Sequence, residues 1–286
     1  MKVLLVSYWF PPTNAMGAVR AGKLAKFLLA AGHDLRVLAG PSLEPLLLPL
    51  EMPLDRVFRP GVAVPAERPV TSGQGTRAAR AFAAPLKDAI RPHYYAMRFI
   101  PDRQASWLQP AIALGRAAMA AWRPDVILAS APPFTGLIAT RRLSREFAIP
   151  WVAEFRDSWA DDPYSTDPWW RRRLDRLFER LVLRSAAGLV AVSPVVARTL
   201  RERYVQPVRT ILNGFAEEDI PPVRPRARSA SLSIIYTGSI YVGYRDPTPL
   251  FAAIARLGER RHLVTASFYG PAEHEILPLA ARQGIA

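Results

Sequence analysis

The hydrophobic positions of the chain form short apolar runs that alternate with amphipathic stretches. The run Lys2–Tyr8 is almost continuously apolar, which is typical of a parallel strand covered on both faces. Between Gly17 and Ala31 apolar residues recur at helical spacing, Gly32 follows as a C-cap residue, and the next apolar run is 35–39. This order predicts a strand, a helix and a second parallel strand joined by a right-handed crossover.

The same alternation continues far along the chain. It predicts strands at Asp125–Ser130, Pro150–Phe155 and Ala187–Ser193, and helices at Thr135–Phe147 and Trp169–Ser185. Repeated strand–helix units indicate a doubly wound, Rossmann-like α/β domain with a parallel sheet. Residues 40–76 are rich in proline and glycine and show little periodicity, so we expect loops there.

A second α/β domain is expected to follow a linker at residues 216–231. Its pattern predicts strands at 232–238 and 263–270 and a helix at Thr248–Leu257. We therefore predict an N-terminal domain with linker at 1–226 and a partial C-terminal domain at 227–286. Two strands are far short of an independent open sheet, so we expect the chain to be truncated within this second domain.

Composition and charge narrow the class of protein. Half of the residues are hydrophobic and none is cysteine, which excludes disulfides and cysteine metal sites and fits a reducing, cytoplasmic compartment. No apolar window approaches the roughly 18 residues of a membrane-spanning helix. The formal net charge of +14 favours an anionic partner, such as a membrane surface, nucleic acid or a phosphorylated substrate. An arginine-rich source genome would explain the same excess.

The loop before the first helix is a candidate ligand site. A helix N-terminus at the carboxyl end of a strand presents free N–H groups and the positive end of the helix dipole. Gly17 would let a ligand approach that backbone closely. The loop lacks G-x-G-x-x-G, so a nicotinamide or flavin fingerprint is absent. A strand-to-helix turn without a ligand remains the alternative.

Six further stretches occur in a recognisable order: "FPPTNAMGAVRAGKLAKFLLAAGHDLRVL", "PDVILASAPPFTG", "IPWVAEFRDSW", "GLVAVSPVVARTLRERY", "ILNGFAEEDI" and "IIYTGSIYVGYRDPTPLFAAI". With them, the chain resembles the glycosyltransferase family 4 enzymes of the GT-B fold over nearly its whole length. The resemblance implies transfer of a sugar from a nucleotide-diphosphate donor, with retention at the anomeric carbon.

The resemblance also implies roles for residues of the first domain. Gly17 would lie against the donor diphosphate, and Arg20, one helical turn on, could reach the same phosphates. Asp157 would orient or deprotonate the acceptor hydroxyl, with Arg156 beside it. The alternatives are a solvated Arg20, and an Arg156 and Asp157 that simply pair with each other or with neighbouring residues.

Three more residues are expected at the acceptor side of the cleft: Asn14, Trp159 and Asn213. An ordinary Asn-Gly turn is the alternative for Asn213. His33 is interpreted as a packing and capping residue rather than a catalytic one.

In the second domain the resemblance assigns Gly238 and Arg245 to the donor diphosphate, because a cation there would neutralise the leaving group. Ser239 is a departure, since the family often has arginine at its place. The family's two glutamates, spaced eight apart, are expected beyond Ala286. The pair Glu146 and Glu154 has that spacing by chance.

Two basic segments bear on the acceptor. Residues 56–106 carry a cationic and apolar stripe, and in 169–185 Arg172, Arg176, Arg180 and Arg184 recur every four residues while leucines cover another face. Such a helix can lie on an anionic leaflet beside a lipid-linked acceptor. A helix packed on the sheet with a solvated polar face is the alternative, and 56–106 is the better membrane candidate.

These patterns lead to one expectation with one alternative. We expect a retaining glycosyltransferase of cell-surface polysaccharide synthesis, with a nucleotide sugar and a glycan or polyprenyl-linked acceptor as partners, in the cytoplasm and peripheral to the inner membrane face. No cofactor, metal or nucleic-acid partner is expected. The alternative is a noncatalytic module that binds nucleotide or sugar and needs a partner.

Overall fold

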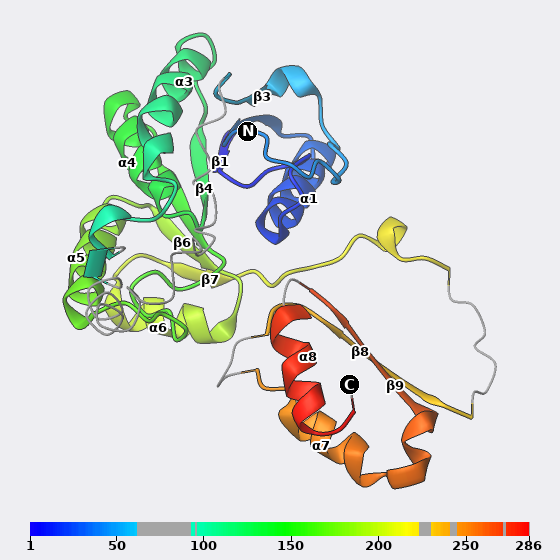
Figure 1. Ribbon diagram of the computed structural model, residues 1–286. Coiled ribbons are helices and arrows are strands. Elements are labelled where there is room, and N and C mark those ends of the chain that lie inside the picture. Colours follow the sequence, from blue (N-terminus) through cyan, green and yellow to red (C-terminus); the bar gives the residue numbers. More distant parts are fainter. Residues whose placement is uncertain (62–92, 95, 223–229, 241–244, 271–272, 286) are drawn as a thin grey trace. The chain divides into compact units, whose positions relative to one another are not determined.

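A computed structural model describes residues 1–61, 93–94, 96–222, 230–240, 245–270 and 273–285 (Figure 1). The chain forms two compact units, Met1–Asp219 and Ile220–Ala286. The division lies within the predicted linker and slightly before the predicted domain boundary at 226. Most of the basic segment 56–106 lies outside the described residues.

The larger unit is built on a seven-stranded sheet in the order β3-β2-β1-β4-β5-β6-β7, in which every pair of neighbours is parallel. The strands are β1 Lys2–Ser7, β2 Asp34–Ala39, β3 Val57–Phe58, β4 Val126–Ala131, β5 Trp151–Phe155, β6 Gly188–Ala191 and β7 Val208–Thr210. The predicted α/β fold with a parallel sheet is confirmed.

Helices cover both faces of this sheet. They are α1 Met16–Ala30, α3 Leu108–Ala120, α4 Thr135–Phe147, α5 Trp169–Leu183 and α6 Pro194–Arg203, with short 3-10 helices at Leu54–Arg56, Ala105–Trp107 and Glu217–Asp219. α1 lies on one face, and α3 and α4 lie on the other (Figure 1). Right-handed connections that run toward opposite edges of a sheet place their helices on opposite faces. The connection from β1 to β2 runs toward the β3 edge, whereas the connections after β4 run toward the β7 edge, so α1 lies on the other face from α4.

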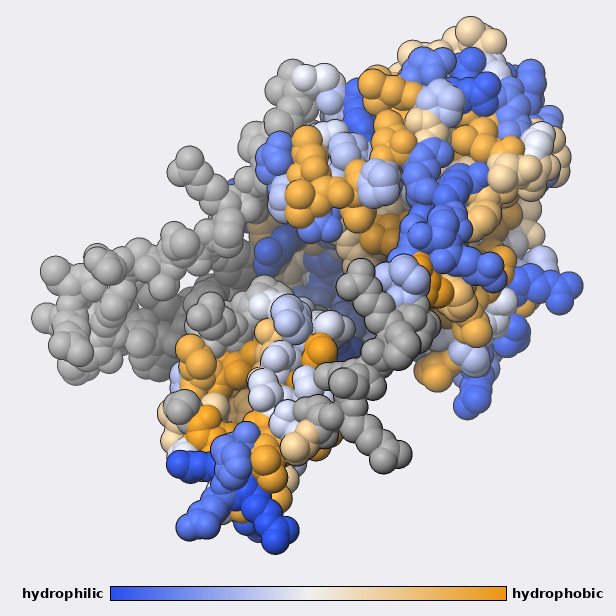
Figure 2. Space-filling model, turned by 90° about the vertical axis from the view of Figure 1, so that its right-hand side faces the viewer, coloured by the Kyte–Doolittle hydropathy of each residue, from blue (hydrophilic) through white to orange (hydrophobic). Residues whose placement is uncertain are grey.

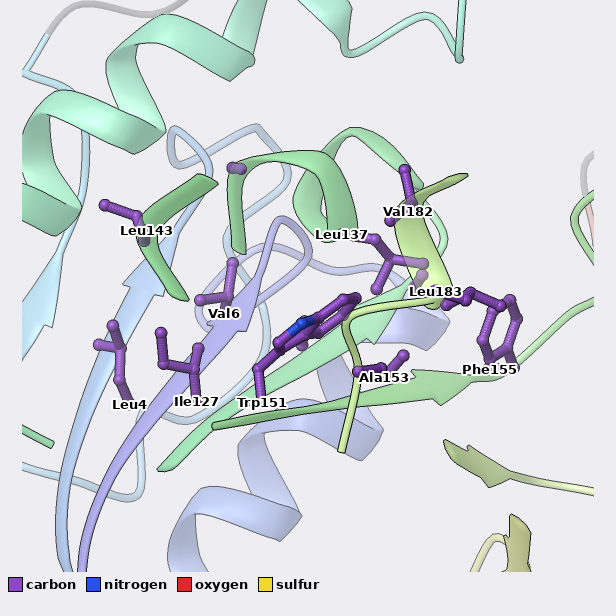
Figure 3. Close-up of a cluster of buried hydrophobic side chains, with 14 of the residues drawn as sticks. Leu4, Val6, Ile127, Leu137, Leu143, Trp151, Ala153, Phe155, Val182 and Leu183 are labelled. Atoms are coloured by element: carbon purple, nitrogen blue, oxygen red, sulfur yellow. The ribbon is translucent and has the colours of Figure 1, made fainter. Parts of the chain in front are cut away.

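The main core lies between the sheet and α4 and α5. Alternate strand residues such as Leu4, Val6 and Ile127 point to this face, as the period of two in a strand requires. Trp151 and Phe155 of β5 are fully buried there (Figure 3). A second cluster joins α1 to the other face of β1 and β2. Burial on both faces explains the continuous apolar runs in the sequence.

The N-terminus of α4 is capped by a carboxylate from a distant part of the sequence. Phe134 stands at the N-cap position and offers no capping side chain. Instead Asp102 accepts hydrogen bonds from the backbone N–H of Thr135 at 2.9 Å and from its hydroxyl at 2.7 Å. A carboxylate at a helix N-terminus is stabilised by the N–H groups and the helix dipole. This contact holds the loop that joins β4 to α4.

The packing of α5 corrects the interpretation of segment 169–185 as a helix with an apolar face on the sheet. Its buried residues include the charged Arg171, Asp175 and Glu179, whereas Leu177 and Leu181 are exposed. Arg171 pairs with Asp175 at 2.8 Å and donates to three backbone carbonyls of residues 96–101. Charged residues can be buried because these partners replace water.

The smaller unit contains two parallel strands, β8 Leu232–Thr237 and β9 Val264–Tyr269. Its helices are α7 Thr248–Arg256, the 3-10 helix Gly258–Leu263 and α8 Glu273–Arg282. These bounds agree closely with the predicted strands and helix. Within the described ranges, no helix combines the length and apolarity that a bilayer crossing would need.

Candidate functional site

A pocket of about 350 Å³ lies beside the carboxyl ends of β4 and β5 and the N-terminus of α1. In open parallel sheets this edge is where ligands bind. The pocket brings together five predicted site residues and four others: Gly17, Arg20, Arg156, Asp157 and Asn213, with Trp9, Ala15, Met16 and Pro132. Residues far apart in the sequence therefore share one cavity, and their functional roles stay predictions.

Gly17 is in contact with the side chain of Arg156. A Cβ at position 17 would lie 3.0–3.2 Å from three guanidinium atoms of Arg156. The Nη1 of Arg156 donates to the carbonyl of Gly17 and to the Ser130 hydroxyl, both at 3.2 Å, and its Nη2 donates to the carbonyl of Pro132. The missing side chain thus lets a guanidinium approach the backbone of α1, which the sequence had not indicated.

Burial lowers the pKa of Arg156, and Arg20 lowers it further, while Glu154 and Asp157 oppose that change. A guanidinium has an ordinary pKa well above neutrality and stays protonated in proteins. Arg156 therefore holds a positive charge at the floor of the pocket, close to the N-terminus of α1. Both features favour an anion at this position.

Arg20 is the centre of a polar network beneath the pocket. Its Nε and Nη2 donate to Oε1 of Glu154 at 3.1 and 2.8 Å. Its remaining donors reach the side chain of Asn213 at 2.9 Å and the carbonyls of Ile211 and Leu212 at 3.0 and 3.1 Å. An arginine has five N–H donors, and all are used by the protein. These contacts give Arg20 a structural role, and its predicted role in diphosphate binding stays a prediction.

Glu154 was not predicted as a site residue, yet it joins two sides of the network. It is 2% exposed, and its Oε2 accepts a 2.5 Å hydrogen bond from Ser130. The signal in the sequence is a lone acidic residue inside the apolar run "WVAEF". Glu146, which has the eight-residue spacing to it, is an exposed partner of Arg116 on another helix. The two glutamates form no common site, as expected from their chance spacing.

Asp157 lies at the pocket with its side chain exposed. Desolvation raises its pKa, Arg156 opposes this and Asp162 adds to it, so the net effect is a raised pKa. A carboxylate with a raised pKa holds a proton more readily than an ordinary aspartate. Within the described residues no hydrogen bond joins Asp157 to Arg156, whereas Arg156 bonds to Gly17, Ser130 and Pro132, as the alternative of pairing with neighbours expects.

The three predicted acceptor residues differ in their surroundings. Asn213 lines the pocket and accepts from Arg20. Asn14 lies just before α1 and is exposed, and its backbone N–H donates to the carbonyl of Pro45. Trp159 is 6% exposed and stacks on Phe134, with ring centroids 4.7 Å apart. Trp159 therefore packs into the core next to the pocket loops and does not line the pocket.

A second groove of about 330 Å³ adjoins the pocket and shares Met16, Arg20 and Asn213 with it. It lies between α1 and residues 211–215, and several of its apolar residues are exposed: Met16, Phe27, Ile211, Leu212 and Phe215. Apolar and polar residues are mixed over the visible face of the larger unit (Figure 2).

The predicted donor residues of the smaller unit lie at the carboxyl end of its sheet. Gly238 follows β8, has a φ of 136° and donates its N–H to the carbonyl of Tyr269. Only glycine adopts such a backbone without strain. Arg245 is exposed just before α7. Their assignment to the diphosphate stays a prediction.

Solved structures with a similar fold include several glycosyltransferases. Anabaena Alr3699/HepE, solved with UDP and glucose, is 14% identical, with a TM-score of 0.56 over 100% of this chain and 67% of that one. Arabidopsis thaliana UGT89C1, solved with quercetin, is 17% identical, with a TM-score of 0.52 over 96% and 71%. The lipopolysaccharide outer core galactosyltransferase WaaB is 9% identical, with a TM-score of 0.51 over 100% and 66%.

These similarities establish the fold as GT-B type, and this chain spans about two thirds of the length of each neighbour. A comparison with curated proteins gives no match. The model of the glycosyl transferase 4-like domain matches residues 17–214, which is well over half of the chain and includes the pocket residues Gly17, Arg20, Pro132, Arg156, Asp157 and Asn213. The chain therefore belongs to the glycosyl transferase 4-like family.

Proposed function

We propose that this protein transfers a sugar from a nucleotide-diphosphate donor to a glycan or lipid-linked acceptor, with retention at the anomeric carbon, in the synthesis of cell-surface polysaccharide. One observation carries the proposal. The pocket gathers an exposed carboxylate, a half-buried cation and a helix N-terminus within one cavity of about 350 Å³. Family membership supports the transferase reaction, and the choice of sugar, acceptor and stereochemistry is part of the proposal.

The donor diphosphate would lie at the N-terminus of α1. Ala15, Met16 and Gly17 line the pocket, and the N-cap residue Ala15 makes no side-chain hydrogen bond to the helix. The first N–H groups of a helix need partners from outside it. A phosphate oxygen can accept from them, and the charge of Arg156 adds to the attraction. Gly238 and Arg245 would contribute cationic and backbone contacts from the smaller unit.

Asp157 is the proposed acceptor-side base. Its exposure at the pocket allows contact with an acceptor hydroxyl, and its raised pKa makes the carboxylate a stronger proton acceptor than an ordinary aspartate. Arg156, half-buried next to Asp157 in the sequence, would hold the negative charge of the diphosphate close to the reacting sugar. Asn213, held by Arg20, would offer an amide to a sugar or acceptor hydroxyl.

Binding to an anionic membrane surface is also proposed, and only the positive charge of the protein supports it. The net charge of +14 and the exposed arginines of α5 suit an anionic leaflet, where a lipid-linked acceptor would be found. The competing function is a noncatalytic module that binds the nucleotide sugar without transfer. The groups in the pocket that would bind a nucleotide sugar suit both sugar transfer and noncatalytic binding.

Binding and transfer can be measured separately on the chain 1–286. Calorimetry with UDP, GDP, ADP and dTDP sugars should find one donor that binds, and a radiolabelled sugar assay with lipid-linked and glycan acceptors should detect transfer. In Asp157→Asn, transfer should fall by about 10²–10⁴-fold while donor binding is kept. Asp55→Asn, an exposed aspartate far from the pocket, is the matched control.

The outcomes distinguish the two functions. Donor binding with no transfer by any acceptor would favour the noncatalytic module. An Asp157→Asn protein that transfers as fast as the control would remove Asp157 as the base. Absence of binding to every nucleotide sugar would overturn the proposal.

A further inference from the structure

An arginine-lined groove lies outside the candidate site. It is lined by residues of α3 and α4 and has a volume of about 770 Å³. These two helices lie on the face of the sheet opposite α1 (Figure 1). Its charged lining consists of Arg116, Arg141, Arg142, Arg145 and Glu146. None of its lining residues belongs to the pocket that contains Gly17 and Asp157.

The single glutamate of the groove already has a partner. Arg116 forms a two-pronged ion pair with Glu146, with Nε and Nη2 at 2.7 and 2.8 Å from the two carboxylate oxygens. Arg142 lies 3.9 Å from the same carboxylate. Within the described part of the chain, Arg141 and Arg145 form no ion pair with a carboxylate. The groove therefore has an excess of positive charge that its own residues do not neutralise.

Arg141 is the unusual member of the cluster. Its Nε is buried and has no hydrogen-bond partner among the described residues. Its pKa is lowered by burial and by the nearby positive charges of Arg145 and Arg184. An arginine in the last turn of α4 is favourable for the helix dipole, which explains Arg145. The dipole does not explain why a buried donor beside Arg145 lacks an acceptor, and buried donors are rarely left so.

We propose that this groove binds a phosphate-bearing anion, held by Arg141 and Arg145 with Arg116 and Arg142 at its sides. Phosphate is the favoured anion because it carries more charge than a carboxylate and because the guanidinium fork matches its oxygens. The volume is in the range of pockets that hold whole small molecules, about 300–1,000 Å³, so the groove has room for a ligand larger than one free phosphate.

Two sources share this chemistry: a soluble compound with a diphosphate or polyphosphate group, and the headgroup of an anionic phospholipid. The site is independent of the proposed transfer reaction, since it contains none of the residues assigned to donor or acceptor. A ligand here would anchor or regulate the protein at a distance from the pocket.

Calorimetry with pyrophosphate on the chain 1–286 at low ionic strength tests the site. In Arg141→Gln/Arg145→Gln, binding to the groove should weaken at least about tenfold, because each charge-assisted hydrogen bond is among the stronger kinds. Binding that survives belongs to the N-terminus of α1. Arg198→Gln, an exposed arginine on α6, removes one charge elsewhere and should leave both binding events unchanged.

A second variant protects the test against misfolding. Arg145 is exposed, so Arg145→Gln alone should keep the circular dichroism spectrum and melting temperature of the parent while it weakens pyrophosphate binding severalfold. Sedimentation with phosphatidylglycerol vesicles, against phosphatidylcholine vesicles, then identifies the source. Vesicle binding that is lost in Arg141→Gln/Arg145→Gln assigns a lipid headgroup, and loss of pyrophosphate binding alone assigns a soluble compound.

Two results would overturn the proposal. One is equal binding of pyrophosphate and vesicles by the parent and the folded Arg141→Gln/Arg145→Gln protein. The other is an equal loss in Arg198→Gln, which would show that general positive charge, rather than this groove, attracts the anion. Neither result depends on donor binding at Gly17, so the proposed function can fail or hold separately.

Discussion

Arg20 of α1 and Glu154 at the end of β5 form an ion pair, with Nη2 of Arg20 2.8 Å from Oε1 of Glu154. The two side chains are 14% and 3% exposed. The same guanidinium holds residues 211–213, so one arginine joins the first helix, the middle of the sheet and the segment after β7. The floor of the pocket depends on this contact.

We expect Arg20→Met to destabilise the larger unit strongly. The change leaves Glu154 buried without its cation, and breaking a buried ion pair from one side costs about 3–5 kcal/mol in unfolding free energy. The double variant Arg20→Met/Glu154→Leu should be more stable than Arg20→Met, because it also removes the carboxylate that Arg20→Met leaves without its cation. Urea denaturation followed by circular dichroism measures all three proteins.

The exposed pair Arg116–Glu146 is the matched control for this prediction. Its side chains are 46% and 34% exposed, and Arg116→Gln should leave the denaturation midpoint nearly unchanged. If Arg20→Met were as stable as Arg116→Gln, the pair would not hold the pocket together.

We expect Gly17→Ala to displace the guanidinium of Arg156. The new Cβ would lie 3.0–3.2 Å from three of its atoms, which is closer than ordinary contact. The displacement moves a positive charge away from the N-terminus of α1, so nucleotide-sugar affinity should fall by about tenfold, the weight of one charge-assisted contact. Calorimetry measures the change.

Gly61→Ala adds a methyl group that has no neighbour within 4 Å among the described residues, and the variant should bind the donor like the parent. An unchanged nucleotide-sugar affinity in Gly17→Ala would show that donor binding does not need the guanidinium of Arg156 at its position against Gly17.

Glu179 should make stability depend on pH in a defined direction. Burial raises its pKa above the ordinary 4.5, although the Tyr204 hydroxyl at 2.6 Å and the Ala160 N–H at 2.9 Å oppose the rise. The folded state therefore binds this proton more tightly than the unfolded state. The resulting stability is fully present below pH 4.5 and is lost as the pH rises through the folded pKa.

Glu179→Gln removes that titration, so its cost in unfolding free energy relative to the parent should be largest near pH 4 and decrease toward pH 7. Denaturant titrations across this range measure the difference, with the exposed Glu259→Gln as control. A cost that grows as the pH rises would contradict the raised pKa.

Gly115→Ala should destabilise the packing of α3 on α4, against the usual trend. Alanine in place of glycine within a helix normally stabilises by about 0.5–1 kcal/mol. Here the added Cβ would collide with Leu143, which is fully buried, and overpacking of this kind costs about 1–3 kcal/mol. Thermal unfolding of Gly115→Ala should show a lower melting temperature. Gly115→Ala/Leu143→Val makes room for the methyl group and should recover part of the loss.

The fold was largely predictable, because its signals are local. The apolar run Lys2–Tyr8 and the helical spacing after Gly17 each depend on residues near one another in sequence, and both elements form within one or two residues of their expected bounds. The parallel order of strands follows from the alternation of strands and helices. The same pattern indicated Gly17 as a residue of the ligand edge, whereas Arg156, Asp157 and Asn213 were expected there from the family resemblance; the structure places all four at one pocket.

The orientation of polar residues was less predictable. The spacing of leucines and arginines in α5 indicated an apolar inner face, whereas Arg171, Asp175 and Glu179 face inward. Periodicity reports which residues share a face, but burial of a charge depends on its partners. The carbonyls of residues 96–101 and the hydroxyl of Tyr204 are those partners, and they come from other parts of the chain.

By itself, the sequence determined the order of the elements, the parallel α/β class and the loops that meet at the ligand edge, because hydrophobic periodicity and glycine positions are properties of neighbouring residues. Only the tertiary structure decided which side chains complete the site. Arg20 and Glu154 are separated by 134 positions, and Arg156 takes its place against Gly17 only when α1 and β5 are folded together. The charges of Arg20 and Glu154 can be buried because each side chain replaces the hydrogen bonds and the opposite charge that water would otherwise provide to the other. No local sequence pattern predicts such a pairing.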